Sequence, residues 1–255
     1  MQQVTPKKAL GQHFLTDEEI ARRIVDSLQA SSHQVLEIGP GMGVLTRYLL
    51  QRSDINLRVV EIDRESVAYL QQHFPALVNR ILSADFLKLP LADLYPDSVC
   101  IIGNFPYNIS SQILFKILEN KDLVPETVGM FQKEVAERVA SAPGKKMYGI
   151  LSVLLQAFFD IEYLFTVHEH SFNPPPKVKS AVIRITRNPE KKLHCDETLF
   201  KNVVKTAFNQ RRKTLRNSLK TFTFNSDFKE NELLTKRPEQ LSVAEFETIC
   251  ENIVQ

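Results

Sequence analysis

Short apolar runs alternate with amphipathic segments along most of this chain, and this alternation restricts the possible fold more than any other feature. The runs have the length of buried strands and are bounded by Gly, Pro and polar residues: 35–38, 57–62, 78–83, 99–103, 127–131, 160–167 and 180–186. Segments with the helical spacing of apolar residues lie between most of them. Strands that alternate with helices pair mainly in parallel. The sequence therefore predicts an α/β fold with a doubly wound, mainly parallel sheet.

A change of pattern marks a domain boundary near Asn188-Pro189, where the charged stretch 190–192 follows. Beyond it the pattern is helical, and Ser242 with Glu245 forms a capping box for a last helix. We predict a domain over residues 1–188 and a small all-helical domain over 189–255. About sixty residues bury little surface alone, so the second domain should dock on the first.

Two features precede the first strand. Residues 1–15, with Pro6 and Gly11, are expected to be mobile. The run Thr16-Asp17-Glu18-Glu19 has the composition of a capping box and predicts the start of a helix. The chain therefore enters its first helix close to Thr16.

The first strand runs into the loop Gly39-Pro40-Gly41-Met42-Gly43. Glycines allow the backbone to approach a ligand closely. The dinucleotide fingerprint G-x-G-x-x-G would place its third glycine at the position of Val44. A simple tight turn is an equally good interpretation of this loop alone.

Polar side chains also follow the later strands. Glu61 stands where an acid would meet a ribose diol, and Asp85 where a carboxylate could accept from an adenine amino group. Each acid alone is more often a loop residue or a helix cap. Together with the glycine loop and Asn104, on successive strand ends, they predict one pocket for S-adenosylmethionine and disfavour a nicotinamide nucleotide.

The tetrad Asn104-Phe105-Pro106-Tyr107 follows the fourth strand, at the edge where open α/β sheets bind ligands. An adenine N6 is a poor nucleophile because its lone pair is delocalised into the ring. Acceptors aimed at its hydrogens, the Asn104 side-chain oxygen and the Phe105 carbonyl, would make it more tetrahedral. Pro106 would fix the local backbone, and Tyr107 would offer a stacking face. A plain strand-end turn is the alternative.

A helix expected over 203–221 would carry a basic face. At about 100° per residue, one side of it presents six polar side chains: Lys205, Asn209, Arg212, Lys213, Arg216 and Lys220. Apolar residues form the opposite stripe, and Arg211 falls among them, which predicts a packing or ion-pair role. A solvated surface is the alternative, but the lack of acids among the six favours RNA phosphate contact.

Composition limits the remaining classes. A net charge of +2 means that nucleic-acid binding must come from local clusters. Three cysteines without a C-x-x-C pair indicate a reducing compartment and no zinc ribbon. The segments His168-Glu169-His170 and His194-Cys195 lack the partners of a metal site. The apolar stretch 150–159 is too short to span a bilayer. We expect a soluble, cytoplasmic protein without a metal or a membrane contact.

These motifs resemble the KsgA-type (RsmA) ribosomal RNA adenine dimethyltransferases over nearly the whole chain. The matching stretches occur in order: 11–15, 37–43, 104–110, 132–138, 172–178 and 208–216. Erythromycin-resistance methylases share the glycine loop and N-x-P-Y, whereas the Pro-Pro-Pro-Lys-Val and Gln-Arg-Arg-Lys runs favour the first family.

The resemblance implies a class I (Rossmann-like) S-adenosylmethionine-dependent methyltransferase domain followed by a small helical domain. In the family, the cofactor is lined by the positions matching His13, Leu15, Gly39, Glu61, Asp85 and Asn104, and Gly41 belongs to the same glycine loop. Positions 104–107 hold the target adenine, and Phe172 stacks on its other face. We assign contacts with the RNA to Lys205, Arg212, Lys213 and Arg216.

The family adds two methyl groups to N6 of each of two adjacent adenosines in the 3′-terminal hairpin of 16S ribosomal RNA, within an immature 30S particle. S-adenosylhomocysteine is then the second product. We expect a monomer that transfers the methyl directly, by alignment, without a covalent enzyme intermediate. Histidine at 13, phenylalanine at 105 and isoleucine at 150 depart from the usual asparagine, leucine and arginine. The alternatives are methylation of large-subunit RNA or DNA adenine, a ribosome-assembly role in which binding matters more than methylation, and a nicotinamide dehydrogenase.

Overall fold

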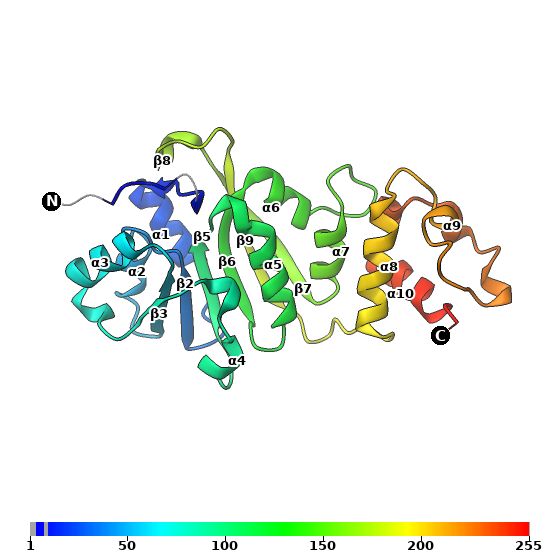
Figure 1. Ribbon diagram of the computed structural model, residues 1–255, viewed down its shortest axis with the longest axis horizontal. Coiled ribbons are helices and arrows are strands. Elements are labelled where there is room, and N and C mark those ends of the chain that lie inside the picture. The colour runs from blue at the N-terminus through cyan, green and yellow to red at the C-terminus, as the bar shows by residue number, and fades with distance from the viewer. Residues whose placement is uncertain (1–3, 8–9, 255) are drawn as a thin grey trace. The chain divides into compact units, whose positions relative to one another are not determined.

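The computed structural model describes residues 4–7 and 10–254. Within them, seven strands form one sheet in the order β4-β3-β2-β5-β6-β9-β7 (Figure 1). The strands are β2 (Gln34–Ile38), β3 (Asn56–Glu61), β4 (Ile81–Ser83), β5 (Cys100–Asn104), β6 (Glu126–Gln132), β7 (Phe159–Val167) and β9 (Ser180–Arg187). A separate pair, β1 (Phe14–Leu15) and β8 (Phe172–Asn173), is antiparallel.

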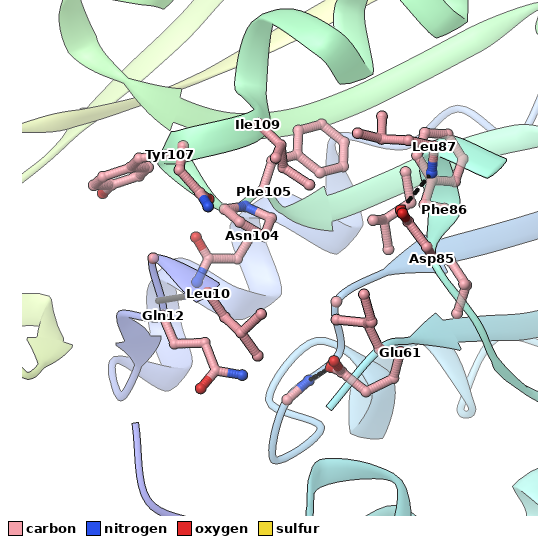
Figure 2. A pocket seen from close by; sticks show the side chains of 18 of the residues that line it. Leu10, Gln12, Glu61, Asp85, Phe86, Leu87, Asn104, Phe105, Tyr107 and Ile109 are labelled. Atoms are coloured by element: carbon pink, nitrogen blue, oxygen red, sulfur yellow. Dashed lines mark hydrogen bonds between the residues drawn. The ribbon is translucent and has the colours of Figure 1, made fainter. Parts of the chain in front are cut away.

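The sheet is mainly parallel, as predicted. The central strand β2 pairs in parallel with β3 and β5, and β5 pairs in parallel with β6. Strand β9 of this sheet runs in the opposite direction, since it pairs antiparallel with β6. The carboxyl ends of β2, β3, β4 and β5 therefore meet at one edge of the sheet (Figure 2).

The helices of the first 160 residues fall close to the predicted segments except for the one at Leu91–Leu94, which the sequence did not predict. They are α1 (Glu18–Asp26), α2 (Thr46–Leu49), α3 (Arg64–His73), α4 (Leu91–Leu94), α5 (Ser110–Glu119), α6 (Lys133–Val139) and α7 (Ile150–Gln156). The C-terminal helices are α8 (Glu197–Asn209), α9 (Leu215–Ser218) and α10 (Val243–Glu251). The capping box of Ser242 and Glu245 at the start of α10 is confirmed.

The first helix starts one residue later than expected. The N-cap of α1 is Asp17, whose carboxylate accepts from the backbone N–H of Glu19 and Ile20. Thr16 instead donates its backbone N–H to the Ser171 carbonyl at 2.8 Å. A carboxylate caps a helix as well as a hydroxyl does, so the tertiary bond at Thr16 decides between the two candidates.

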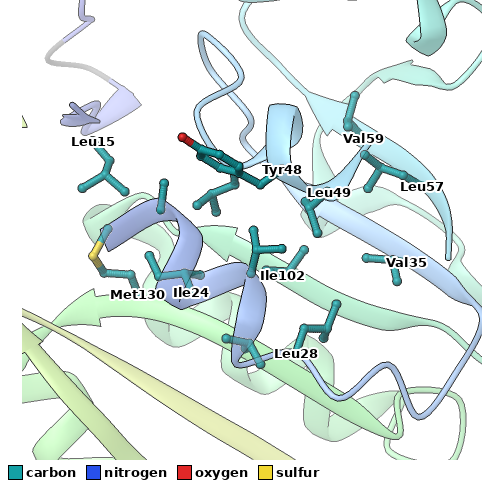
Figure 3. Packing of buried hydrophobic residues seen from close by; sticks show 14 of the residues in the cluster. Leu15, Ile24, Leu28, Val35, Tyr48, Leu49, Leu57, Val59, Ile102 and Met130 are labelled. Carbon is teal, nitrogen blue, oxygen red and sulfur yellow. The ribbon is translucent and has the colours of Figure 1, made fainter. Parts of the chain in front are cut away.

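A hydrophobic cluster packs α1 and α2 against the sheet (Figure 3). Ile24 from α1 and Leu28, which follows that helix, meet strand residues such as Val35, Ile102 and Met130, all fully buried or nearly so. Each such side chain contributes about 1.5–3 kcal/mol on burial. This packing fixes the strands whose ends carry the polar residues described below.

The chain forms two compact units. Unit 1 comprises Met1–Ala136 and Ile161–Arg187, and unit 2 comprises Glu137–Asp160 and Asn188–Gln255. The last division lies beside the boundary expected at 188. Residues 137–160, which the sequence assigned to the first domain, group with unit 2 because α7 packs with α8 and α10.

The single helix expected over 203–221 is wrong. Helix α8 ends at Asn209, a turn follows, and α9 begins at Leu215, whose N–H donates to the Lys236 carbonyl at 2.9 Å. One turn beyond Phe208, the apolar stripe of the expected helix is interrupted by Arg211. With nothing apolar to bury there, the tertiary hydrogen bond outweighs continuation of the helix.

Candidate functional site

Unit 1 contains a cavity at the carboxyl ends of β2, β3, β4 and β5. Its empty space is about 960 Å³, open to solvent at the mouth. Strand ends and following loops supply lining residues from far apart in the sequence, among them Gly39, Gly41, Glu61, Asp85, Asn104 and Tyr107. Figure 2 shows Glu61, Asp85 and Asn104 around this common space. The combination of carboxylates, an amide and apolar side chains in the lining suits a nucleoside-containing ligand.

The glycine loop forms the cavity wall beside β2. Gly39 and Gly41 have φ of +65° and +55°, which side chains other than glycine rarely adopt. A Cβ atom at Gly41 would lie 2.8 Å from a ring carbon of Phe14, another lining residue. The loop therefore needs glycine for both its backbone conformation and its close contact with the N-terminal segment.

Glu61 is held by two backbone donors. One carboxylate oxygen accepts from Gly41 N at 3.1 Å and the other from Asp63 N at 2.9 Å. Burial raises the pKa of Glu61, since it is only 5% exposed, and these hydrogen bonds act in the opposite direction. Each oxygen keeps a second lone pair, which fits the two hydroxyls of a ribose.

Asp85 and its neighbours form the other end of the cavity. One Asp85 oxygen accepts from Leu87 N at 3.0 Å and caps a short 3₁₀ turn, Phe86–Lys88. The sequence identified Asp85 but missed Ile62, which is 53% exposed and lines the cavity. Its signal was an apolar residue between two acids, Glu61 and Asp63, at a strand end. An apolar wall beside a carboxylate suits a purine ring with its amino group.

The Asn104 amide is oriented by the N-terminal segment. Its Nδ2 donates to the His13 carbonyl oxygen at 3.0 Å. Because the nitrogen end is engaged, the amide presents its oxygen, the end that can accept from an exocyclic amine. The spacing of residues in the sequence does not tell which end of the amide is occupied, but this hydrogen bond does.

Phe105 fixes the tetrad from inside the sheet. Its N–H donates to the Met130 carbonyl at 3.1 Å, and its ring packs edge-on against Phe131. Side-chain atoms at Gly103 or Gly129 would overlap that ring, so two facing glycines make room for it. Pro106, with φ −57° and ψ 130°, carries the chain out of β5 in the extended form.

Tyr107 lines the cavity and is half-buried. Its ring stacks on His13, with centroids 5.4 Å apart and planes 28° apart, and its hydroxyl forms a hydrogen bond with Ser180. Burial raises the pKa of Tyr107, and the Ser180 hydrogen bond opposes that rise. His13 lines the same cavity and donates Nδ1–H to the Pro174 carbonyl at 2.9 Å.

The N-terminal segment, expected to be mobile, contributes several cavity residues. Leu10 and Gln12 line the cavity, and Lys7 forms ion pairs with Asp63 and, at 3.3 Å, with Glu65. Although burial opposes it, hydrogen bonds from Lys7, Ser66 and neighbouring groups lower the pKa of Asp63. Residues 1–3 and 8–9 of the expected mobile stretch lie outside the described residues.

Two expected site residues lie away from the main cavity. Leu15 and Phe172 face each other across the β1–β8 pair and are only 3% and 4% exposed. Leu15 lines a smaller adjoining cavity of about 330 Å³, together with Glu37, Gly39 and Asn104. Phe172 belongs to the hydrophobic core cluster and offers no exposed face in this arrangement.

The basic residues belong to unit 2 and do not form one helical face. All six are exposed, but they divide between α8, the turn after it, and the segment from α9 onward. No acid stands among the six, but Arg216 pairs with Glu230, an acid from outside the set, at 3.2 Å. The ion-pair role of Arg211 is confirmed, with Glu239 at 3.8 Å.

The donor set fits S-adenosylmethionine. Carboxylates suit its ribose and cationic groups, glycine backbone allows close approach, and Ile62 with Leu87 gives an apolar surface for adenine. Across residues 4–7 and 10–254, His, Cys, Asp and Glu side chains form no group of three or more that could hold a metal ion. Every helix within the same residues falls short of the length and hydrophobicity that a membrane span requires.

Sequence comparison finds close relatives along the full length. The family model described as ribosomal RNA adenine dimethylase matches residues 4–253. The chain is 62% identical over 249 residues to ribosomal RNA small subunit methyltransferase A of Parabacteroides distasonis, covering 96% of this chain and 93% of that protein. It is 58% identical over 255 residues to the protein of the same name from Flavobacterium johnsoniae, covering 99% and 97%.

Solved structures agree with the fold. A dimethyladenosine transferase from Plasmodium falciparum superimposes with a TM-score of 0.78 at 25% identity, covering 92% of this chain and 94% of that one. The 23S rRNA methyltransferase ErmE superimposes with a TM-score of 0.71 at 24% identity, covering 94% and 100%. The two-part architecture of a methyltransferase sheet followed by helices is therefore shared with both.

Proposed function

Because the chain belongs to the ribosomal RNA adenine dimethylase family, we propose that it methylates N6 of two adjacent adenosines in the 3′-terminal hairpin of small-subunit ribosomal RNA. S-adenosylmethionine is the methyl donor, and N6,N6-dimethyladenosine is the modified nucleoside. Relatives at 62% and 58% identity that carry the small-subunit methyltransferase name support this substrate. The oriented amide of Asn104, in the same cavity as Glu61 and Asp85, carries the proposal.

The donor contributes a methyl group on a positively charged sulfur, which needs alignment more than acid or base assistance. Glu61 accepts from the ribose hydroxyls while Gly41 and Asp63 hold its carboxylate in place. Asp85 accepts from the adenine amino group of the donor, and Ile62 packs against that ring. The glycine loop at Gly39 and Gly41 keeps side chains out of the donor's path.

The tetrad prepares the acceptor. Asn104 Oδ1 and the Phe105 carbonyl accept the two N6 hydrogens of the target adenine, which draws its lone pair out of conjugation. Tyr107 stacks on one face of the extruded base, as enzymes that act on bases require. The second stacking surface for the base is the Phe172 ring. That ring is 4% exposed, so the proposal requires its segment to move and expose it.

Unit 2 supplies the wider RNA contact. Exposed cations at Lys205, Arg212, Lys213 and Arg216 suit phosphates of the ribosomal RNA, and counterion release makes such contacts salt-dependent. We assign the immature small subunit as the substrate form, and a monomer as the active species. Leu15 and His13 hold the N-terminal segment against the donor.

The test is methyl transfer to small subunits that lack the modification. Purified protein, labelled S-adenosylmethionine and unmodified small subunits are incubated, and the ribosomal RNA is digested to nucleosides. The proposal expects the label in N6,N6-dimethyladenosine. Label only in naked large-subunit RNA or in duplex DNA, supplied in parallel reactions, would overturn it. Restoration of subunit maturation by a transfer-deficient variant would instead support an assembly role.

A further inference from the structure

The Tyr107 side chain is restrained at two places. His13 stacks on its ring at 5.4 Å, and its hydroxyl forms a hydrogen bond with Ser180. Tyr107 begins a three-residue 3₁₀ turn, Tyr107–Ile109, that has no side-chain cap. A turn this short does not by itself fix the orientation of the Tyr107 ring. The contacts with His13 and Ser180 restrain it further.

Ser180 is a rigid anchor. It is fully buried, and it is the first residue of β9, where it pairs with Gln132 at the end of β6. Strand β6 pairs in turn with β5, which ends at Asn104. The hydrogen bond to Ser180 therefore joins Tyr107 to the sheet that also carries Asn104. The distance between Tyr107 and Asn104 is then set by the backbone pairing of β9, β6 and β5.

We propose that Ser180 is a positioning residue for methyl transfer, which holds the Tyr107 ring at the angle at which the target base stacks. His13 covers one face of the ring, so a base has one face to use, and a rotation of Tyr107 would misdirect the base relative to Asn104. The inference rests on the proposed function, because it deepens the role of the same tetrad.

The burial of Ser180 supports this role. A buried hydroxyl without a partner is costly, and Tyr107 supplies that partner. The contact joins two side chains of the protein, so its direct effect is on the position of the Tyr107 ring. Because the Tyr107 ring is already positioned before the base binds, the entropy of ordering the ring is not lost during the reaction.

The experiment is a double-mutant cycle with Ser180→Ala and Tyr107→Phe, which remove the same hydrogen bond from opposite ends. Each single variant should lower kcat/KM for unmodified small subunits by about three- to tenfold. The double variant should be no worse than either single one. Affinity for S-adenosylmethionine, measured by calorimetry, should stay unchanged. The coupling shows that both substitutions act through this hydrogen bond, and the unchanged donor affinity separates positioning from a general loss of structure.

Ser152→Ala is the matched control, since Ser152 is equally buried and donates to the Arg138 carbonyl within unit 2. It should not couple to Tyr107→Phe. Full activity of Ser180→Ala, or losses that multiply in the double variant, would overturn the inference. If Ser180→Ala fails to fold, Tyr107→Phe alone tests the inference. An unchanged kcat/KM in Tyr107→Phe would then contradict it. Inactive wild-type protein would overturn the proposed function instead.

Discussion

At Asn104 one hydrogen bond decides which end of the side-chain amide meets a substrate. The His13 carbonyl takes the Nδ2 donor, so the acceptor oxygen is the end that remains. The sequence placed Asn104 at a strand end, but the bond crosses from a segment ninety-one residues earlier. No local pattern encodes such a contact, and it had to come from the fold.

Glu37 is a buried acid beside the cofactor loop. It is 1% exposed and accepts a hydrogen bond from the Thr46 hydroxyl at 2.6 Å. Burial raises the pKa of Glu37 from 4.5 to about 8, with a further contribution from the charge of Glu61, while Thr46 opposes the rise. The folded protein therefore holds a proton that the unfolded chain releases.

This pKa predicts a pH dependence of stability. Because the folded pKa is the higher one, the contribution of Glu37 is complete below pH 4.5 and is lost as the pH rises through about 8. Glu37→Gln keeps an acceptor for Thr46 but does not titrate. We expect its free energy of unfolding, from urea denaturation, to fall less steeply over this range than that of the wild type. Parallel curves would contradict the assignment.

Among the elements, the β5–β6 pair is shaped around Phe105. Gly103 and Gly129 are paired residues of these strands, and a Cβ atom at Gly129 would lie 2.1 Å from the Phe105 ring. Such overlap requires the ring, and with it the tetrad, to move. The strand pair thus determines the geometry of the site as well as the core.

We therefore expect Gly129→Ala to cost about 1–3 kcal/mol of stability, as overpacked cores do, and to lower methyl transfer. Phe105→Leu in the same protein should restore much of both, because it removes the ring that the new methyl group meets. Melting temperature and transfer rate are the measurements. Gly149→Ala is the control, since its nearest neighbours are 3.9–4.0 Å away. Failure of the second change to rescue the first would exclude the overlap as the cause.

The N-terminal segment is attached to the cavity by Lys7. The Lys7 side chain is 37% exposed, and its ammonium group pairs with the buried Asp63 and with Glu65. Lys7→Ala should weaken S-adenosylmethionine binding by about two- to fivefold at low ionic strength. The difference should shrink at high salt, because partly exposed pairs are screened. Lys229→Ala removes an equal charge from unit 2, and an equal loss in it would indicate a general charge effect.

Elements with strong periodic patterns were predictable from the sequence. The predictions failed where hydrogen bonds to residues distant in the sequence override the local pattern. The spacing around Ser110 gave α5 with its observed bounds, and the strand order gave the common edge of Glu61, Asp85 and Asn104. The helix through Gln210 failed because a backbone bond from Leu215 to Lys236 competes with it. Ordering of residues 10–15 was missed because the partners of His13, Asn104 and Pro174, are distant in sequence.

The whole molecule divides its tasks between two units. Unit 1 contains the cavity and the tetrad, while the exposed cations assigned to RNA belong to unit 2. A net charge of +2 leaves no general attraction for RNA, so those local cations should determine affinity. Substrate affinity and donor affinity should therefore respond to different substitutions.

Charge reversal tests this division. Arg212→Glu with Lys213→Glu should weaken binding to unmodified small subunits by at least about tenfold and lower the salt dependence by about one unit per lost phosphate contact. Donor affinity should not change. Lys192→Glu, at another exposed lysine of unit 2, should have a much smaller effect. Equal losses in both proteins would remove Arg212 and Lys213 from the RNA contact.

The central claim is that Asn104 prepares the adenine amine while other residues hold the donor. Its most direct test measures S-adenosylmethionine affinity and single-turnover methyl transfer in Asn104→Ala. We expect affinity within about tenfold of the wild type and a transfer rate at least about a hundredfold lower, as loss of a preorganised polar group causes. Near-normal transfer by Asn104→Ala would contradict the account.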